Sequence, residues 1–300
     1  MGAAMIERLL GAGNAVTVYN RTRAKVEPLV AAGAVAVESI AGLSGLEVVF
    51  TAVASSDDLL SVTVGENGLL VLDEPPQVIV DVSTVSAEAS ALVRQRAADT
   101  GTAVLAAPAS GNPSAVRSGH ATFAVSGPLV AFERVEPLLN TIGANATYCG
   151  DGDVARLVKL CHNLFLGSVT QSLVEVTLLA EKGGVGRESF LAFLNSSVLG
   201  STFTGYKTPA LVNLDFRPTF TARLLRKDME LGLDAARELE VPMPVSALVG
   251  QIVARLVGEG YGEQDFAALI NMQARAAGVD LGNGHTVSGT RLPGAVTGNG

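Results

Sequence analysis

The stretch VIVDVSTVSAEASALVRQRAADTGTAVLAAPASGN, residues 78–112, decides the expected fold. It begins with an apolar run at Val78–Val82, continues through a helical pattern at Ala87–Asp99, and returns to an apolar run at Ala103–Ala107. Apolar runs of this kind are typical of strands that helices cover on both faces. A strand, a helix and a second strand in this order predict a βαβ unit, and therefore a mostly parallel sheet.

The same alternation continues over the first half of the chain and stops after Gly150. Further strands are predicted at Ala15–Tyr19, Ala34–Val37, Val48–Val53, Phe123–Ser126 and Ala146–Tyr148, with helices at Gly2–Ala12 and Ala24–Ala32. The second half contains only helical patterns, at Asp153–Lys182, Glu188–Asn195, Leu224–Leu239, Ser246–Gly258 and Glu263–Ala276. We therefore expect an α/β fold with an N-terminal Rossmann-type doubly wound domain at 1–149 and an all-α C-terminal domain at 150–280. Residues 281–300 are expected to form a disordered tail.

Composition restricts the classes of function. The chain has 300 residues, of which 48% are hydrophobic and 17% charged, enough for about two domains with ordinary cores. Its net charge of -8 argues against nucleic acids and acidic membranes as partners, since both bind clustered lysine and arginine. Lys159, His162 and Glu175 interrupt the most apolar stretch, Leu157–Ala180, so a buried helix is favoured over a membrane span.

The two cysteines, Cys149 and Cys161, do not have the spacing of a metal site, and a chain of this size does not need a disulfide. The N-terminus lacks the basic segment followed by an apolar segment that marks a secreted protein. We therefore expect a cytoplasmic protein with no metal site.

The first predicted helix begins at Gly2, with no strand before it. A dinucleotide-binding fold has a strand and a glycine-rich turn at this point, which place the pyrophosphate on the helix N-terminus. We interpret Gly2 as the last glycine of such a turn and as a cofactor contact. Our hypothesis is that the natural protein starts about a dozen residues upstream, with the missing strand. Upstream codons for a strand and Gly-x-Gly would support it, and a stop codon directly before Met1 would refute it.

The next strand, Ala15–Tyr19, is followed by Asn20, Arg21 and Thr22. Arg21 lies 19 residues after Gly2, near the position where an acidic residue binds the ribose of NAD and an arginine accommodates the 2′-phosphate of NADP. A guanidinium suits a phosphate group, and residues 19–22 include no acidic side chain. The alternative is an ordinary loop with a solvated arginine. We favour cofactor binding, with NADP(H) preferred over NAD(H).

A lysine and an asparagine share one face of the long apolar helix predicted at Asp153–Lys182. Lys159 and Asn163 are four residues apart, and most of their neighbours are apolar. A lysine in a dry cleft can exchange a proton near neutral pH, and an asparagine can donate a hydrogen bond to a substrate oxygen. The alternative is a surface lysine and a solvated asparagine. We select both as catalytic residues.

A polar loop follows the strand Ala103–Ala107, at the edge where ligands bind in such sheets. Its residues Ser110, Gly111 and Asn112 can receive a substrate carboxylate, although the same residue types also favour ordinary turns. We select the three as substrate-binding residues.

Three further residues are candidate cofactor contacts. Val53 and Thr84 follow two other predicted strands, where they either line a nicotinamide pocket or belong to segments that cap the next helix. Lys227 lies near the start of a later helix and can reach an anionic group, although charges at such positions are usually solvated.

Taken in order, these segments resemble the β-hydroxyacid dehydrogenase family, which includes 3-hydroxyisobutyrate dehydrogenases and 6-phosphogluconate dehydrogenases. The resemblance covers residues 1–278 and rests on MGAAM, VYNRT, VDVSTVS, APASGN, GDGDVARLVKLCHN and LLRKDMELGLDAARELEVPMP. It implies that Lys159 is the catalytic lysine, that Thr84 contacts the nicotinamide and that Lys227 closes over the cofactor. It also implies that the helical domain builds a homodimer or homotetramer. Asn112 replaces a second glycine found in many members, which leaves the exact substrate open.

From the residues and the resemblance we expect an NADP(H)-dependent oxidoreductase that interconverts a small 3-hydroxy acid and its semialdehyde. Lys159 would act as general acid in reduction and general base in oxidation, while Asn163 orients the reacting oxygen. A small carboxylate is the expected partner. The alternatives are an imine reductase on the same scaffold and a non-catalytic nucleotide-binding protein.

Overall fold

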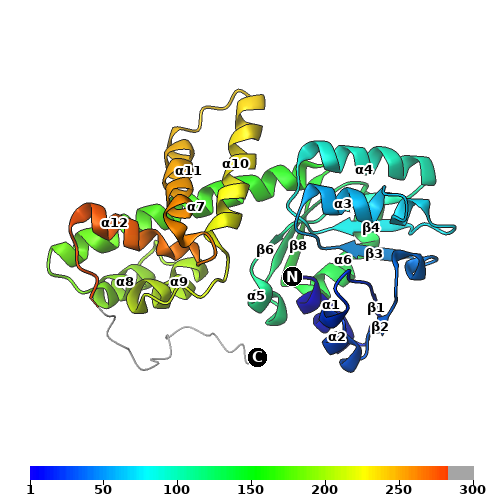
Figure 1. Cartoon of the computed structure of the whole chain (residues 1–300), viewed down its shortest axis with the longest axis horizontal. Helices are drawn as coiled ribbons and strands as arrows, with labels where there is room; N and C mark the ends of the chain where they lie inside the picture. The colour runs from blue at the N-terminus through cyan, green and yellow to red at the C-terminus, as the bar shows by residue number, and fades with distance from the viewer. Residues whose placement is uncertain (283–300) are drawn as a thin grey trace. The chain divides into compact units, whose positions relative to one another are not determined.

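The computed structural model describes residues 1–282, which form two compact units. The first unit contains Met1–Leu164 and Leu231–Val241, and the second contains Phe165–Glu230 and the segment from Pro242 onward. Each unit has its own fold and is described by itself (Figure 1). Residues 283–300, nearly all of the tail predicted at 281–300, lie outside the described residues.

The first unit is built on a six-stranded sheet with the order β3-β4-β5-β7-β6, in which β8 also pairs with β7. Its strands are β3 (Val48–Thr51), β4 (Val78–Asp81), β5 (Ala103–Ala106), β6 (Ala109–Ser110), β7 (Thr122–Ser126) and β8 (Asn145–Gly150). β3, β4 and β5 are parallel, β7 runs antiparallel to β5 and β6, and β8 is parallel to β7. A separate parallel pair consists of β1 (Thr17–Val18) and β2 (Val35–Ala36).

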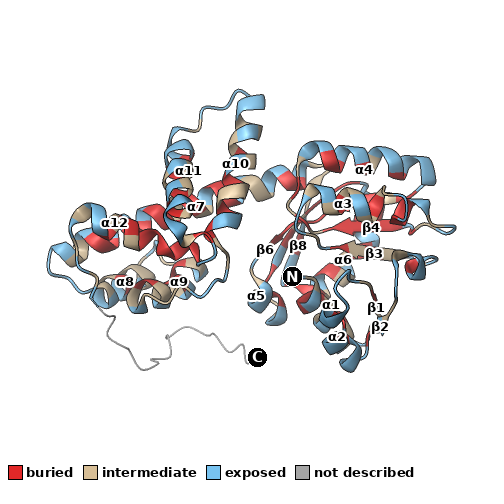
Figure 2. Cartoon of the chain, viewed as in Figure 1, coloured by how far each residue is buried: buried red, intermediate tan, exposed pale blue. Residues whose placement is uncertain are grey.

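Helices cover both faces of this sheet (Figure 1). The helices of the first unit are α1 (Gly2–Gly11), α2 (Glu27–Ala31), which packs against the β1–β2 pair, α3 (Ser56–Thr63), α4 (Ala87–Thr100), α5 (Pro113–Arg117), α6 (Leu129–Ile142) and the first part of α7 (Val154–Lys182), with short 3-10 turns at Arg23–Lys25, Ile40–Leu43 and Leu69–Val71. Successive side chains of β4 point to opposite faces of the sheet, so the strand packs against one layer of helices on each face. Val80 packs with Met5 of α1, whereas its neighbour Ile79 packs with Leu59 of α3 and Val93 of α4. All four residues of β4 are buried, which is why the strand reads as a continuous apolar run (Figure 2).

The second unit consists of helices. They are the rest of α7, α8 (Arg187–Ser196), α9 (Thr202–Asn213), the start of α10 (Ala222–Glu238), α11 (Pro244–Leu256) and α12 (Leu269–Ala277), with a π turn at Val257–Tyr261 and a 3-10 turn at Phe266–Ala268. α7 and α10 approach closely at Gly167, where a β-carbon would lie 2.9 Å from the sulfur of Met229. By length and composition α7 could cross a membrane, but half of its most apolar window is buried, as in the core helix of a soluble protein.

A buried ion pair ties the helical unit together. Lys207 of α9 donates to Asp265 over 2.6 Å and to Thr219 over 3.0 Å, and both charged side chains are almost fully buried. The ammonium also lies 4.0 Å from the ring centre of Phe266. Burial lowers the pKa of Lys207, and the carboxylate of Asp265 opposes that effect.

The predicted combination of a Rossmann-type domain and a helical domain is confirmed. The helix predicted at Ala24–Ala32 is instead a 3-10 turn and the short α2, because Pro28 starts a new helix. The predicted start of the last helix at Glu263 is wrong, because Asp265 has an extended backbone and caps the 3-10 turn that precedes α12. The short strand β6 and the helices α3, α5, α6 and α9 were not predicted from the sequence.

Candidate active site

The site begins at the carboxyl ends of β3 and β4, which side-chain hydrogen bonds tie together. Asp81, the last residue of β4, accepts from the hydroxyl of Thr51 on β3 over 2.7 Å and from the backbone N–H of Ser83 over 3.2 Å. The backbone N–H of Val53 donates to the hydroxyl of Ser83 over 2.9 Å. The loops that carry Val53 and Thr84 are therefore held next to each other, where cofactor contacts were predicted.

A buried arginine fixes the start of α7 against these loops. Arg156 donates to the carboxylate of Asp81 over 2.7 Å and to the carbonyl oxygen of Ser83 over 2.9 Å. Its Nε atom lies 2.9 Å from the carboxylate of Asp153, which also pairs with Arg94 of α4. The guanidinium thus joins β4, the loop after it and the first turn of α7. This geometry fixes the rotation of α7 about its axis.

Lys159 follows Arg156 by three residues, so the two side chains lie on the same face of α7. Both line a crevice too narrow to hold a water molecule, together with Ser83, Thr84, Val85, Pro108 and Leu160. Lys159 is half-buried, and the structure places it beside Thr84, the residue predicted to contact the nicotinamide. A lysine in this position can deliver a proton to a group bound at the carboxyl ends of β4 and β5.

A chain of polar side chains joins α7 to residues 108–113, the loop with the predicted substrate residues, called the substrate loop below. The hydroxyl of Ser110, on β6, lies 2.9 Å from Nε2 of His162, and Nδ1 of the same ring lies 2.9 Å from Oδ1 of Asn163. Asn163 is almost fully buried. Burial lowers the pKa of His162, the hydrogen bond to Asn163 works against it, and the charge of Lys159 lowers it further. The structure therefore brings Ser110 and Asn163 together through an imidazole.

The other two predicted substrate residues shape the loop. Gly111 has a φ of 129°, and a β-carbon there would lie 3.1 Å from that of Ala115, so this position favours glycine. Oδ1 of Asn112 accepts from the backbone N–H of Ala115 over 2.9 Å and caps α5. This end of Asn112 is engaged within the loop, which leaves its Nδ2 end for any contact with substrate.

At the N-terminus, α1 begins at Gly2 and has no side-chain cap. A β-carbon on Gly2 would contact Ala52, in the segment that follows β3, at 3.5 Å. The first backbone N–H groups of a helix have no partner within the helix and carry a partial positive charge, so they attract anions. This helix terminus fits the phosphates of a dinucleotide.

The residues predicted to select the cofactor follow β1. Oδ1 of Asn20 accepts from the backbone N–H of Thr22 over 2.8 Å, which forms a tight turn. Arg21, at the turn, is 86% exposed and has a weak ion pair of 3.5 Å with Asp58. An incoming phosphate would therefore replace only this weak ion pair with Asp58. Lys227 belongs to the helical unit, where its ammonium lies 3.4 Å from Asp228.

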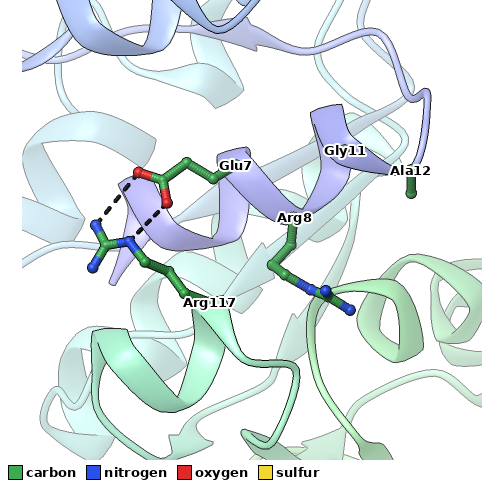
Figure 3. A pocket seen from close by; sticks show the side chains of 5 residues that line it. All are labelled: Glu7, Arg8, Gly11, Ala12 and Arg117. Atoms are coloured by element: carbon green, nitrogen blue, oxygen red, sulfur yellow. Dashed lines mark hydrogen bonds and ion pairs between the residues drawn. The ribbon is translucent and has the colours of Figure 1, made fainter.

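A second hollow, on the first unit, lies between α1 and α5 and is shown in Figure 3. Arg117 donates to both carboxylate oxygens of Glu7, and Arg8 donates to the carbonyl oxygen of Thr141 over 3.2 Å. Both guanidinium groups thus have protein partners, and none of the predicted site residues lines this hollow. It is not our candidate for the active site.

Sequence reasoning did not select Asp81, Arg156 or His162 as site residues. Asp81 ends a fully apolar strand and Arg156 shares a helical face with Lys159, and both patterns are visible in the sequence. His162 was interpreted only as an interruption of an apolar run. Its partner Ser110 lies 52 positions away, so no local pattern joins them.

Two family models match the chain. Residues 1–150 match the NAD binding domain of 6-phosphogluconate dehydrogenase. Residues 150–273 match the model described as NAD-binding of NADP-dependent 3-hydroxyisobutyrate dehydrogenase. Together the two models cover the sheet, the loops of the site and most of the helical unit.

Similar proteins agree with the family models. The chain is 31% identical to 2-(hydroxymethyl)glutarate dehydrogenase of Eubacterium barkeri, over 95% of each chain. It is 28% identical to glyoxylate/succinic semialdehyde reductase 2 of Arabidopsis thaliana, over 90% of this chain and 76% of the relative. The structure of Mycobacterium tuberculosis 3-hydroxyisobutyrate dehydrogenase with L-serine matches with a TM-score of 0.79 at 25% identity, over 91% of this chain and 95% of that one.

The fold, the site and these comparisons together define an oxidoreductase of hydroxy acids that uses a nicotinamide cofactor. The chain belongs to the β-hydroxyacid dehydrogenase family.

Proposed function

We propose that this protein catalyses reversible hydride transfer between NADP(H) and a small 3-hydroxy acid or its semialdehyde. The observation that carries the proposal is the position of Lys159, which lines the same crevice as Thr84. Asn163, one helical turn further along α7, connects through His162 to Ser110 of the substrate loop. A proton donor, an oxygen-orienting amide and a carboxylate receptor thus belong to one unit of the fold.

The residues present fit a dinucleotide. The N-terminus of α1 at Gly2 would receive the pyrophosphate, while Val53 and Thr84 would line the nicotinamide end. Arg21, in the turn formed by Asn20 and Thr22, would receive the 2′-phosphate and so favour NADP(H). When bound, the cofactor supplies the hydride for reduction and accepts it in oxidation. The match to an NADP-dependent family model supports this choice.

The protein groups would perform the proton chemistry. In reduction Lys159 protonates the oxygen of the carbonyl group, and in oxidation it removes the same proton from the hydroxyl. The amide of Asn163 donates a hydrogen bond that orients this oxygen. Ser110 and the backbone at Gly111 receive the carboxylate. We further propose that Lys227 closes over the cofactor and that the protein is a cytoplasmic homodimer or homotetramer.

The test is a substrate panel with the purified protein. It contains 3-hydroxyisobutyrate, succinic semialdehyde, glyoxylate and a cyclic imine, each assayed with NADP(H) and with NAD(H) by nicotinamide absorbance. Turnover of the carbonyl or hydroxy acids with NADP(H) supports the proposal. Turnover of the imine alone assigns an imine reductase. NADPH binding without turnover of any compound assigns a non-catalytic role.

Lys159→Ala tests the role of the lysine. General acid–base catalysis contributes about 10²–10⁴ in rate, so turnover should fall by that factor while NADPH affinity stays nearly unchanged. Lys182→Ala is the matched control, because Lys182 lies on the same helix, is exposed and lies at the opposite end. Unchanged turnover in Lys159→Ala would refute the assignment.

A further inference from the structure

His162 lies between two residues of the proposed site, and its hydrogen bonds determine where its proton lies. Oδ1 of Asn163 has lone pairs and no hydrogen, so the bond of 2.9 Å requires a hydrogen on Nδ1 of His162. A neutral imidazole carries only one such hydrogen. Nε2 must then be the acceptor, and the hydroxyl of Ser110 donates to it over 2.9 Å.

The surroundings of His162 favour this neutral form. Partial burial of the ring lowers the pKa of His162, the hydrogen bond to Asn163 opposes this, and the ammonium of Lys159, on the same helix, lowers the pKa further. From β6 the facing group is the uncharged hydroxyl of Ser110, and the amide of Asn163 is also uncharged. Near neutral pH the ring therefore offers Ser110 a lone pair.

This arrangement is the wrong one for binding an anion. A serine hydroxyl has one hydrogen, and here it points at His162. Ser110 would present only lone pairs to an incoming carboxylate, which is itself only an acceptor. Protonation of Nε2 removes the conflict, because the N–H of the imidazolium then donates to Ser110 and the hydroxyl hydrogen can turn to the carboxylate.

We propose that His162 is a positioning residue that takes up one proton from solvent when a substrate carboxylate binds, so that the Ser110–His162 hydrogen bond reverses. The bond from Nδ1 to Asn163 is the same in both states, so Asn163 keeps its place. The imidazolium also adds a positive charge next to the bound anion. The inference rests on the proposed function, because it assigns the carboxylate to Ser110.

Proton uptake makes affinity depend on pH with a defined sign. The bound carboxylate raises the pKa of His162. Affinity for the carboxylate is therefore highest at a pH below the pKa that His162 has in the free protein. As the pH rises, this affinity falls by up to about tenfold per pH unit, until the pH exceeds the pKa that His162 has in the complex. Above that pH it is again constant. A ligand without a carboxylate should show no such dependence.

The experiment is isothermal titration calorimetry of the NADPH-saturated protein with 3-hydroxyisobutyrate, a combination that cannot react. Titrations in buffers of different ionisation enthalpy give the number of protons taken up. We expect uptake of up to one proton, largest where the pH lies between the two pKa values. The uncharged 3-hydroxyisobutyramide should cause none. His162→Gln, which can form hydrogen bonds but cannot titrate, should bind the carboxylate with no uptake and with a KM that does not change with pH in this window.

A second measurement needs no variant. Nitrogen-15 NMR of the imidazole should show hydrogen on Nδ1 alone in the NADPH complex and on both nitrogens after 3-hydroxyisobutyrate is added. Binding without proton uptake, or uptake that persists in His162→Gln, would overturn this inference and leave the proposed function intact. If the wild-type protein neither binds nor oxidises 3-hydroxy acids, both proposals fail.

Discussion

Replacement of Arg156 by methionine tests whether the buried ion pair fixes the site. Methionine fills similar space but cannot pair with Asp81, whose carboxylate is 2% exposed. Removal of one partner of a buried pair leaves an uncompensated charge, which costs about 3–5 kcal/mol of stability. Asp81 keeps its bonds from Thr51 and from the backbone of Ser83, so we expect the lower part of this range for Arg156→Met.

The assay is urea unfolding followed by circular dichroism, with and without the companion change Asp81→Asn. Asparagine keeps an acceptor for Thr51 but carries no charge, so the double variant should recover part of the lost stability. A coupling energy of about 0.5–3 kcal/mol is expected for groups in contact. Arg217→Met is the control, because Arg217 pairs with Asp215 at an exposed site and its loss should change nothing measurable.

The same variant should affect catalysis, because Arg156 holds the face of α7 that carries Lys159. We expect kcat to fall and affinity for NADP(H) to weaken as well, because Arg156 also holds the carbonyl of Ser83, next to the proposed cofactor contact Thr84. The reasoning is refuted if Arg156→Met unfolds at the same urea concentration as the control and keeps full turnover. Recovery of stability in the double variant without recovery of turnover would still support the positioning role.

Three further predictions concern the cofactor and the helical unit. Arg21→Asp should weaken NADPH by about 10- to 100-fold, as expected for a charge-assisted contact, with a smaller effect on NADH in fluorescence titrations, and equal losses would contradict the selector role. Lys207→Met should lower the free energy of unfolding by about 3–5 kcal/mol, because it leaves Asp265 buried and unpaired. Burial works to raise the pKa of Asp265, but Lys207 and hydrogen bonds hold it below the ordinary value of 3.8. The contribution of Asp265 is therefore complete above about pH 3.8 and is lost as the pH falls through its lower folded pKa, and acid unfolding of Asp265→Asn should lack this step.

The strands of the sheet could be predicted because burial leaves a direct mark on the sequence. All of β4 is buried, so Val78–Asp81 is a nearly unbroken apolar run that only Asp81 ends. The direction of β7 leaves no such mark, since an apolar strand reads alike whether its neighbours are parallel or antiparallel. β6 has two residues and shows no periodicity. α9 contains an internal proline, Pro209, which lowers its helical character in sequence.

In the candidate site, too, some features could be predicted from the sequence and others could not. Lys159 and Asn163 could be selected because a helix repeats its faces every three to four residues. The pairing of the groups that orient them could not be predicted, because Asp81 lies 75 positions before Arg156, and Ser110 lies 52 before His162. Such pairs depend on how strands and helices pack, and a single sequence does not record this.

The packing in turn explains how one helix can serve both fold and chemistry. Arg156, Lys159 and Asn163 are spaced by three and four residues, which places them within about 60° of one another around α7. The ion pair of Arg156 with Asp81 therefore sets the direction of all three side chains at once. A slip of one residue along α7 would turn Lys159 by about 100°, away from Thr84, and would separate His162 from Ser110. The buried charge pair is costly to desolvate, and we infer that it excludes that alternative register.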